Sequence, residues 1–190
     1  MALAKATRDK LLSVGTTRVL AALARHGPKR RPLPGLRPLA AFQDAIAGEA
    51  SNTIDGLPPG GVLVVEDSTL SVPVGLLARR QAAGVVSGKP LRNAAELARV
   101  GLPAWHRPPN PAAKPLPIDA GDIVLADRNG VIAIPANLAD QIAEEAVEAV
   151  AYEEFLAEQV SSGGGVYGLH IPSGDNARRA FEAWRRLRGR

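Results

Sequence analysis

The segment 121-GDIVLADRNGVIAIP-135 contains the strongest local folding signal in the chain. Two apolar runs flank the tetrapeptide Asp127-Arg128-Asn129-Gly130. Asn-Gly is a preferred pair for a tight β-hairpin, and short apolar runs are typical of buried strands. Pro135 cannot donate a ladder hydrogen bond, so it ends the second strand. We therefore predict an antiparallel hairpin, with the Asp127 side chain stabilising its own turn.

Upstream of this hairpin, apolar runs and amphipathic segments alternate. Residues 62–66 (VLVVE) and 84–87 (GVVS) are nearly continuous apolar runs, which are typical of strands covered on both faces. A helix is predicted after each of them, from Ser71 and Pro73 to Ala83, and over 93–100. This β-α-β-α order indicates an α/β fold.

The rest of the chain predicts four helices and one extended connection. These elements are a helix over 16–26 that Gly27 ends, a weak helix over 40–50, a stiff proline-rich connection over 107–117, a long amphipathic helix over 138–160 and a basic helix over 175–188. Trp105 is expected in the core. The three histidines, His26, His106 and His170, have no metal-ligand spacing and are expected to be structural or exposed.

Composition limits the class of protein. A chain of 190 residues that is 46% hydrophobic and 22% charged can bury one full core. The absence of cysteine excludes disulfides and thiolate metal sites. No apolar run is long enough to cross a bilayer, and the N-terminus has no signal-peptide pattern. We therefore expect a cytoplasmic protein that does not contact membranes.

The net charge of +4 is unevenly distributed. Residues 136–160 contain seven acids and no Lys or Arg, whereas 178–190 contain six arginines. Helices of opposite charge pair, within or between subunits, more often than they bind a polyanion. Because no aromatic residues alternate with the basic ones, the pattern does not favour nucleic-acid binding.

These elements, in this order, resemble the RraA-like family, which includes 4-hydroxy-4-methyl-2-oxoglutarate aldolase, oxaloacetate decarboxylases and regulators of ribonuclease activity. The resemblance runs end to end, from the opening helix LLSVGTTRVLAALARHG to the C-terminal EEFL, GVYGLHIP and FEAWR. Between them it includes LPGLRPL (33–39), PPGGVLVVE (58–66), VGLLA, AGVVSGKPLRN (83–93) and, most specifically, the hairpin segment. It implies an α/β fold in one compact domain over 1–190, with mixed β-sheet layers flanked by helices, similar to the swivelling phosphohistidine domain. Residues 136–190 would be a C-terminal helical extension used in assembly.

The sequence departs from the family pattern around the expected site. The glycine-rich loop after the first strand reads DSTLSVPVG (67–75), and the family's Arg-Asp pair is Arg92-Asn93. The family's G-x-A-x-T strand is not recognisable between residues 41 and 56.

In the family, the Arg-Asp pair supports a divalent-metal mechanism. The Arg binds a substrate carboxylate, and the Asp ligates the Mg²⁺ or Mn²⁺ that chelates a 2-oxo acid and stabilises its enolate. The resemblance therefore implies the following roles: Arg92 and Asp67 catalytic, Asn93 and Asp67 metal-binding, and Arg92, Lys89, Ser68 and Gly75 substrate-binding. Because Asn93 offers only a neutral carbonyl oxygen, we expect weakened metal affinity.

Each of these residues also has a structural interpretation. Asn93 with Glu96 three residues later is similar to a helix capping box. Lys89 fits a solvated loop lysine, Arg92 an ordinary salt bridge, and Asp67 and Ser68 a turn cap.

Three functions therefore stay open. The first is a metal-assisted aldolase or decarboxylase acting on a 2-oxo acid. The second is a binding or regulatory module, or a repurposed enzyme. The third is a basic RNA-associated protein. The family resemblance also implies a homotrimer or hexamer with sites between subunits.

Overall fold

The computed structural model describes residues 3–27, 32–41, 43–66, 71–110, 112–163 and 175–189, with side chains in the last range described from 177 onward. Helices and strands occur in the chain order α1 (Lys5–Ala24), β1 (Arg37–Pro38), β2 (Ile46–Ser51), β3 (Val62–Val65), α2 (Val74–Arg79), β4 (Gly84–Ser87), α3 (Ala94–Arg99), β5 (Ala104–His106), β6 (Ile123–Asp127), β7 (Gly130–Ile134), the short 3-10 helix η1 (Ala136–Leu138), α4 (Ala139–Ser161) and α5 (Asp175–Leu187). None of these helices is long and apolar enough to span a membrane.

The strands form one mixed sheet in the order β1-β5-β4-β3-β2-β6-β7. Strands β2, β3, β4 and β5 are parallel, whereas β1, β6 and β7 pair antiparallel with their neighbours. The sheet is nearly closed, because Pro32 bridges to Ile132 of β7 and Arg37 then pairs with His106 of β5. The predicted α/β fold with a mixed sheet is therefore confirmed.

Strand β2 corrects two predictions from the sequence. Residues 40–50 were expected to be weakly helical, and no strand was recognisable between 41 and 56. The chain instead forms a buried strand between β3 and β6. A Cβ at Gly48 would lie 2.2 Å from the carbonyl oxygen of Gly60, so only glycine allows this close approach of the two backbones. Tertiary packing overrides the helical preference of Ala and Glu here.

Most other predicted elements are present with shifted ends. Strand β4 matches its prediction, and α2 ends at Arg79 rather than Ala83. No helix or strand forms in the described part of the proline-rich connection 107–117. The three-residue strand β5 was not predicted.

Asp127 organises the end of the sheet at the hairpin. Helix α1 is longer than predicted and is kinked at Gly15, which has φ 75° and ψ 170°. Beyond the kink, the Thr16 backbone N–H donates to Asp127 Oδ2 at 2.8 Å and its Oγ1 donates to Asp127 Oδ1 at 2.7 Å. The Asn129 N–H also donates to Asp127 Oδ1, at 2.7 Å, which confirms the predicted turn role. One carboxylate therefore stabilises both the hairpin turn and the start of a helical segment.

The hairpin turn occupies the predicted tetrapeptide, but Asn-Gly is not its central pair. Asp127 pairs with Gly130, so Arg128 and Asn129 form the two-residue loop. Gly130 has a φ of 148°. The glycine is needed at the first position of the returning strand, not at the centre of the turn.

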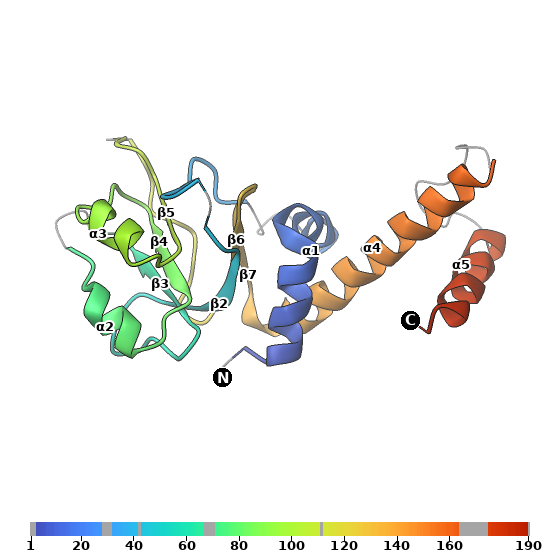
Figure 1. The fold of residues 1–190 in the computed structure, drawn as a ribbon, viewed down its shortest axis with the longest axis horizontal. Helices are drawn as coiled ribbons and strands as arrows, with labels where there is room; N and C mark the ends of the chain where they lie inside the picture. The colour runs from blue at the N-terminus through green and yellow to red at the C-terminus, as the bar shows by residue number, and fades with distance from the viewer. Residues whose placement is uncertain are drawn as a thin grey trace.

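The core has three parts. Helices α1 and α4 pack outside strands β2, β6 and β7, whereas α2 and α3 pack outside β3, β4 and β5, so the two helix pairs lie on opposite sides of the molecule (Figure 1). A third apolar cluster fills the interior of the curved sheet. Trp105 in this interior is fully buried, as predicted, and its Nε1 donates to the Asp127 backbone oxygen at 3.1 Å.

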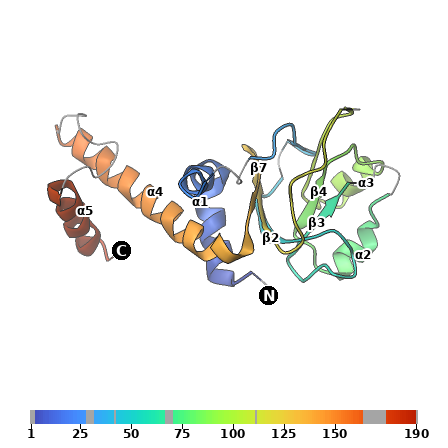
Figure 2. The ribbon, with the colours of Figure 1, turned by 180° about the vertical axis from the view of Figure 1, so that it is seen from behind.

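Helices α4 and α5 form an arm that extends away from the sheet (Figures 1 and 2). A small separate core joins them, consisting of Ala151, Phe155, Phe181 and Trp184. Ion pairs connect Arg185 with Glu148 and Arg188 with Glu158. The predicted pairing of helices of opposite charge therefore occurs within one chain.

Candidate functional site

The parallel strands β3, β4 and β5 bring several polar residues to one edge of the sheet. In register, Val65 lies beside Ser87, and Ser87 lies beside His106. Ligands of open α/β sheets bind outside the carboxyl ends of such strands. The predicted site residues Lys89, Arg92 and Asn93 follow β4 at this edge. Asp67 and Ser68 follow β3 in sequence but lie outside the described residues.

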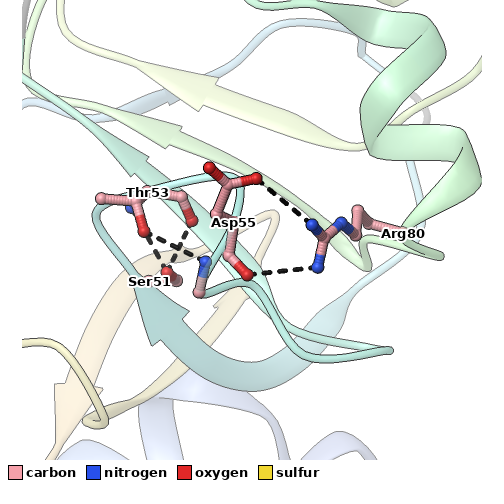
Figure 3. A network of polar contacts seen from close by, with 5 residues as sticks. Ser51, Thr53, Asp55 and Arg80 are labelled. Atoms are coloured by element: carbon pink, nitrogen blue, oxygen red, sulfur yellow. Dashed lines mark hydrogen bonds and ion pairs between the residues drawn. The ribbon is translucent and has the colours of Figure 1, made fainter.

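Two serines fix the backbone at the ends of β4 and β2 in the same way. Ser87 Oγ donates to the Lys89 carbonyl at 2.7 Å and accepts the Lys89 N–H at 3.2 Å. At the end of β2, Ser51 Oγ donates to the Thr53 carbonyl at 2.7 Å and accepts the Thr53 N–H at 3.3 Å (Figure 3). These side-chain turns satisfy polar backbone groups where the ladder ends. The conformation at Lys89 is therefore fixed by a serine that is 1% exposed.

The turn after β2 differs from the turn after β4 because α2 closes it. Arg80 Nη1 donates to the Asp55 carbonyl at 3.1 Å, and Nη2 contacts Asp55 Oδ1 at 3.3 Å (Figure 3). The Asp55 side chain is fully exposed, so this pair contributes little to stability. In the turn after β2, Arg80 and Asp55 nevertheless bond each other, so they are less available to a ligand. The end of β4 is therefore the stronger candidate for a ligand site.

Asn93 holds the segment before α2 against α3. Its Oδ1 accepts the Val72 N–H at 3.1 Å, and its Nδ2 donates to the Val72 carbonyl at 2.7 Å. The same Nδ2 donates to Glu96 Oε2 at 3.0 Å. Asn93 occupies the N-cap position of α3, but its side chain makes no cap hydrogen bond. The predicted capping-box geometry is therefore wrong, although Glu96 does contact Asn93.

This contact requires an amide. The Asn93 side chain both accepts from and donates to the backbone of Val72, which is buried. An ionised carboxylate only accepts, so an Asp at this position would lose both donated bonds. The amide at position 93 thus has a structural reason of its own.

The described residues do not provide a magnesium site. They include no group of three or more Asp, Glu or His residues that could hold a metal ion. The Asn93 carbonyl oxygen already accepts from Val72, and Glu66 Oε1 accepts the Leu116 N–H at 2.7 Å. Mg²⁺ favours several charged oxygen ligands. Asp67, the other implied ligand, lies outside the described residues, so the described donor set does not fit this metal.

Gly75 faces a different feature from the other predicted substrate-binding residues. It lies in α2 and lines a mainly apolar cleft of about 420 Å³, together with Ala78, Val100 and Leu102. A Cβ at Gly75 would meet no atom within 4 Å, so no close approach requires glycine there. The described contacts do not connect Gly75 with Lys89 or Arg92.

Sequence reasoning missed two residues at the carboxyl edge. Pairing of β4 with β5 and of β5 with β1 aligns Ser87, His106 and Arg37 in one row. Arg37 is exposed, and neither Arg37 nor Lys89 has a side-chain hydrogen bond or ion pair within the described part of the chain. Arg37 lies in the LPGLRPL stretch, but only the strand pairing brings it beside His106. With the exposed Arg92, these side chains bring three cations to this edge, where the Glu66 carboxylate also lies, against Gly88.

His26 lies against helix α4 and not among the residues of this edge. His26 Nε2 lies 2.9 Å from Glu145 Oε1 and 3.0 Å from Oε2, which confirms a structural role. Desolvation raises the pKa of Glu145, but the hydrogen bonds from His26 and Gln141 and the charges of His26 and Arg25 outweigh it and lower that pKa. His170 lies outside the described residues.

Solved structures share the fold of this chain, although no protein-family model and no curated protein matches its sequence. An uncharacterised protein from Pseudomonas syringae pv. tomato str. DC3000 is 18% identical, with a TM-score of 0.68 over 90% of this chain and 100% of that chain. RraAS2 from Streptomyces coelicolor, described as an unusual member of the RNase ES inhibitor RraA protein family, is 23% identical, with a TM-score of 0.67 over 82% of this chain and 97% of that chain.

A third structure, described as belonging to novel cellulases from microbes associated with the gut ecosystem, is 16% identical, with a TM-score of 0.67 over 80% of this chain and 87% of that chain. The chain therefore has the RraA-like fold predicted from its sequence. At these identities the likeness concerns the fold, and function has to be argued from the site.

Proposed function

We propose that this RraA-like chain binds a small oxyanion-bearing molecule at the carboxyl edge, through Arg92 and Lys89, without metal-dependent turnover. It would act as a binding or regulatory module rather than as a lyase. The observation that carries this proposal is the Asn93 side chain, whose donor and acceptor both bind the Val72 backbone.

The charges of the edge support an anionic ligand. Lys89 is partly buried on a turn that Ser87 fixes, and Arg92 is exposed immediately before Asn93 and α3. A guanidinium group binds carboxylate or phosphate with two parallel hydrogen bonds, and an ammonium group adds a second positive charge. A 2-oxo acid, as the family resemblance implies, offers a ligand group of this type.

The test is calorimetric titration with oxalate, a non-reactive analogue of a 2-oxo acid, with and without Mn²⁺. We expect binding without metal, weakened about tenfold or more in Arg92→Ala. Arg179→Ala is the matched control, because Arg179 is an exposed arginine of α5, in the arm that extends away from the sheet. Equal binding by Arg92→Ala and the wild type would contradict the proposal.

The second candidate is the aldolase or decarboxylase activity implied by the family resemblance. It is favoured by Arg92 at the carboxyl edge and by Asp67, which follows β3 in sequence. Pyruvate formation from oxaloacetate and from a 4-hydroxy-2-oxo acid, with and without Mn²⁺, separates the two functions. Mn²⁺-dependent pyruvate release that Arg92→Ala abolishes would establish the lyase and overturn the non-catalytic proposal.

We also propose that the chain assembles as a homotrimer or hexamer in which the arm of α4 and α5 takes part. The arm extends beyond the sheet and has a core of its own (Figure 2). Light scattering of the full chain would test this. A monomeric full chain would contradict it.

A further inference from the structure

We infer that His106 and Arg37 form a second oxyanion-binding subsite at the carboxyl edge, with His106 donating from Nε2. This inference extends the proposed function, because it adds a subsite beside the one assigned to Arg92 and Lys89. The group it would bind is a carboxylate or a phosphate of a small ligand.

The His106 ring has two nitrogens in different environments. Nδ1 is fully buried and has no hydrogen-bond partner, whereas Nε2 is not among the buried atoms that lack a partner. No hydrogen bond of the His106 side chain is present either, so Nε2 keeps access to solvent. A buried polar atom without a partner is uncommon in a folded protein and requires an explanation.

The burial of Nδ1 determines which nitrogen carries the proton. A buried N–H without an acceptor is rarer and costlier than a buried lone pair without a donor. The neutral ring therefore has its lone pair at Nδ1 and its proton at Nε2. Nε2–H is then a hydrogen-bond donor that faces solvent and is not used within the described part of the chain.

The β1–β5 pairing brings Arg37 to the same place. Residues directly opposite each other on antiparallel strands have Cβ atoms about 5 Å apart and side chains on the same face. Arg37 is the partner of His106 in this register, and it is exposed without an ion pair among the described residues. A neutral N–H donor beside an unpaired guanidinium suits a single oxyanion.

Strand β4 connects this subsite with the first one. Ser87 is the register partner of His106 on the other side, and its hydroxyl fixes the backbone of Lys89. The row Arg37–His106–Ser87 therefore ends beside the turn that carries Lys89. We expect a ligand with two anionic groups to contact both subsites, and a ligand with one to occupy either.

The test is long-range ¹H–¹⁵N NMR of the histidine rings in the full chain, first alone and then with oxalate or inorganic phosphate. We expect His106 in the Nε2–H form and a saturable shift of its Nε2 signal with at least one of the two probes. The two probes distinguish a carboxylate from a phosphate subsite. His26 serves as the internal reference, because Glu145 already occupies its Nε2.

Variants separate this inference from the proposed function. Arg37→Ala should weaken the His106 response about tenfold, Arg37→Lys should retain part of it, and Arg179→Ala should not change it. Arg92→Ala should weaken oxalate binding while the His106 Nε2 shift persists at higher concentration. Arg92-dependent binding without any His106 response would overturn the subsite and leave the proposed function intact. A proton on Nδ1 would also overturn it.

Discussion

The two ends of the sheet use charge in opposite ways. At the hairpin end, the Asp127 carboxylate accepts hydrogen bonds from Thr16 and Asn129. At the carboxyl end of the parallel strands, Arg37 and Lys89 have no ion-pair partner within the described residues. The hairpin end is therefore organised for stability, and the other end keeps cations available for a ligand.

The acids of helix α4 resemble Asp127 in that most of them have partners within the chain. Six of its acids contact partners on α1, α5 or the turn after α1: Asp140, Glu144, Glu145, Glu148, Glu153 and Glu158. These pairs orient helices against one another. Each exposed pair contributes only about 0–1 kcal/mol to the free energy of unfolding. These pairs therefore help to determine how α1, α4 and α5 pack together more than they add to stability.

The largest effect is expected at the hairpin end. Asp127→Ala removes the acceptor for the Thr16 N–H and Oγ1 and for the Asn129 N–H. We expect a loss of about 3 kcal/mol in the free energy of unfolding, because hydrogen bonds to a charged group and a helix start are lost together. Urea denaturation measures this loss. A change below about 1 kcal/mol would remove the contrast between the two ends.

Asn93→Asp tests a polar side chain at the carboxyl end that serves the architecture. The variant loses the bonds donated to the Val72 carbonyl and to Glu96 Oε2, and it places a carboxylate beside both acceptors. We expect about 2 kcal/mol of destabilisation by urea denaturation. If the variant is as stable as the wild type and acquires Mn²⁺-dependent turnover, the structural reason given for this asparagine is wrong.

A smaller, pH-dependent effect is expected for His26→Ala. His26 helps to lower the pKa of Glu145 below its ordinary value of 4.5, so the ionised carboxylate stabilises the fold above that pH. This contribution is lost as the pH falls through the lowered folded-state pKa. The variant should therefore lose about 1 kcal/mol at pH 5.5 and approach the wild type as the pH falls below the lowered pKa of Glu145. Thermal unfolding across this range measures the difference, and a pH-independent loss would exclude the Glu145 contact as its cause.

The smallest effect on stability is expected for Lys89→Ala. The Lys89 backbone is held by Ser87, but its side chain has no described partner. The free energy of unfolding should change by less than about 0.5 kcal/mol, while oxalate binding weakens. A larger loss of stability would show that this cation has a structural role, and the contrast between the two ends would no longer hold for it.

Local sequence signals predicted the elements that depend on their own residues. Strand β4 and the β6–β7 hairpin were identified from continuous apolar runs, and α4 from its apolar stripe. Strand β2 was missed because its Ala, Gly and Glu residues favour a helix, and only its neighbours β3 and β6 make it a strand. Gly48, a glycine in a short apolar segment, was the one residue of β2 that could have indicated a close contact with a neighbouring strand.

The candidate site was less predictable for the same physical reason. Asn93 was placed correctly at the start of α3, but its main partner, Val72, lies 21 residues earlier in the sequence. Strands β2, β3 and β4 lie between Arg37 and His106 in the sequence, and the two residues meet only because β1 pairs with β5. Residue types indicated a cationic site after β4, whereas the contacts that define its extent depend on the tertiary structure.

The nearly closed sheet also affects how this chain can avoid aggregation. A free strand edge offers a row of backbone groups to which a strand of another molecule can add. Here the terminal strand β1 has only two residues, one of them Pro38, and Pro32 bridges to the outer side of β7. Proline donates no backbone hydrogen bond, so both edges make poor templates. Copies of this chain should therefore associate through helices and side chains rather than by extending the sheet.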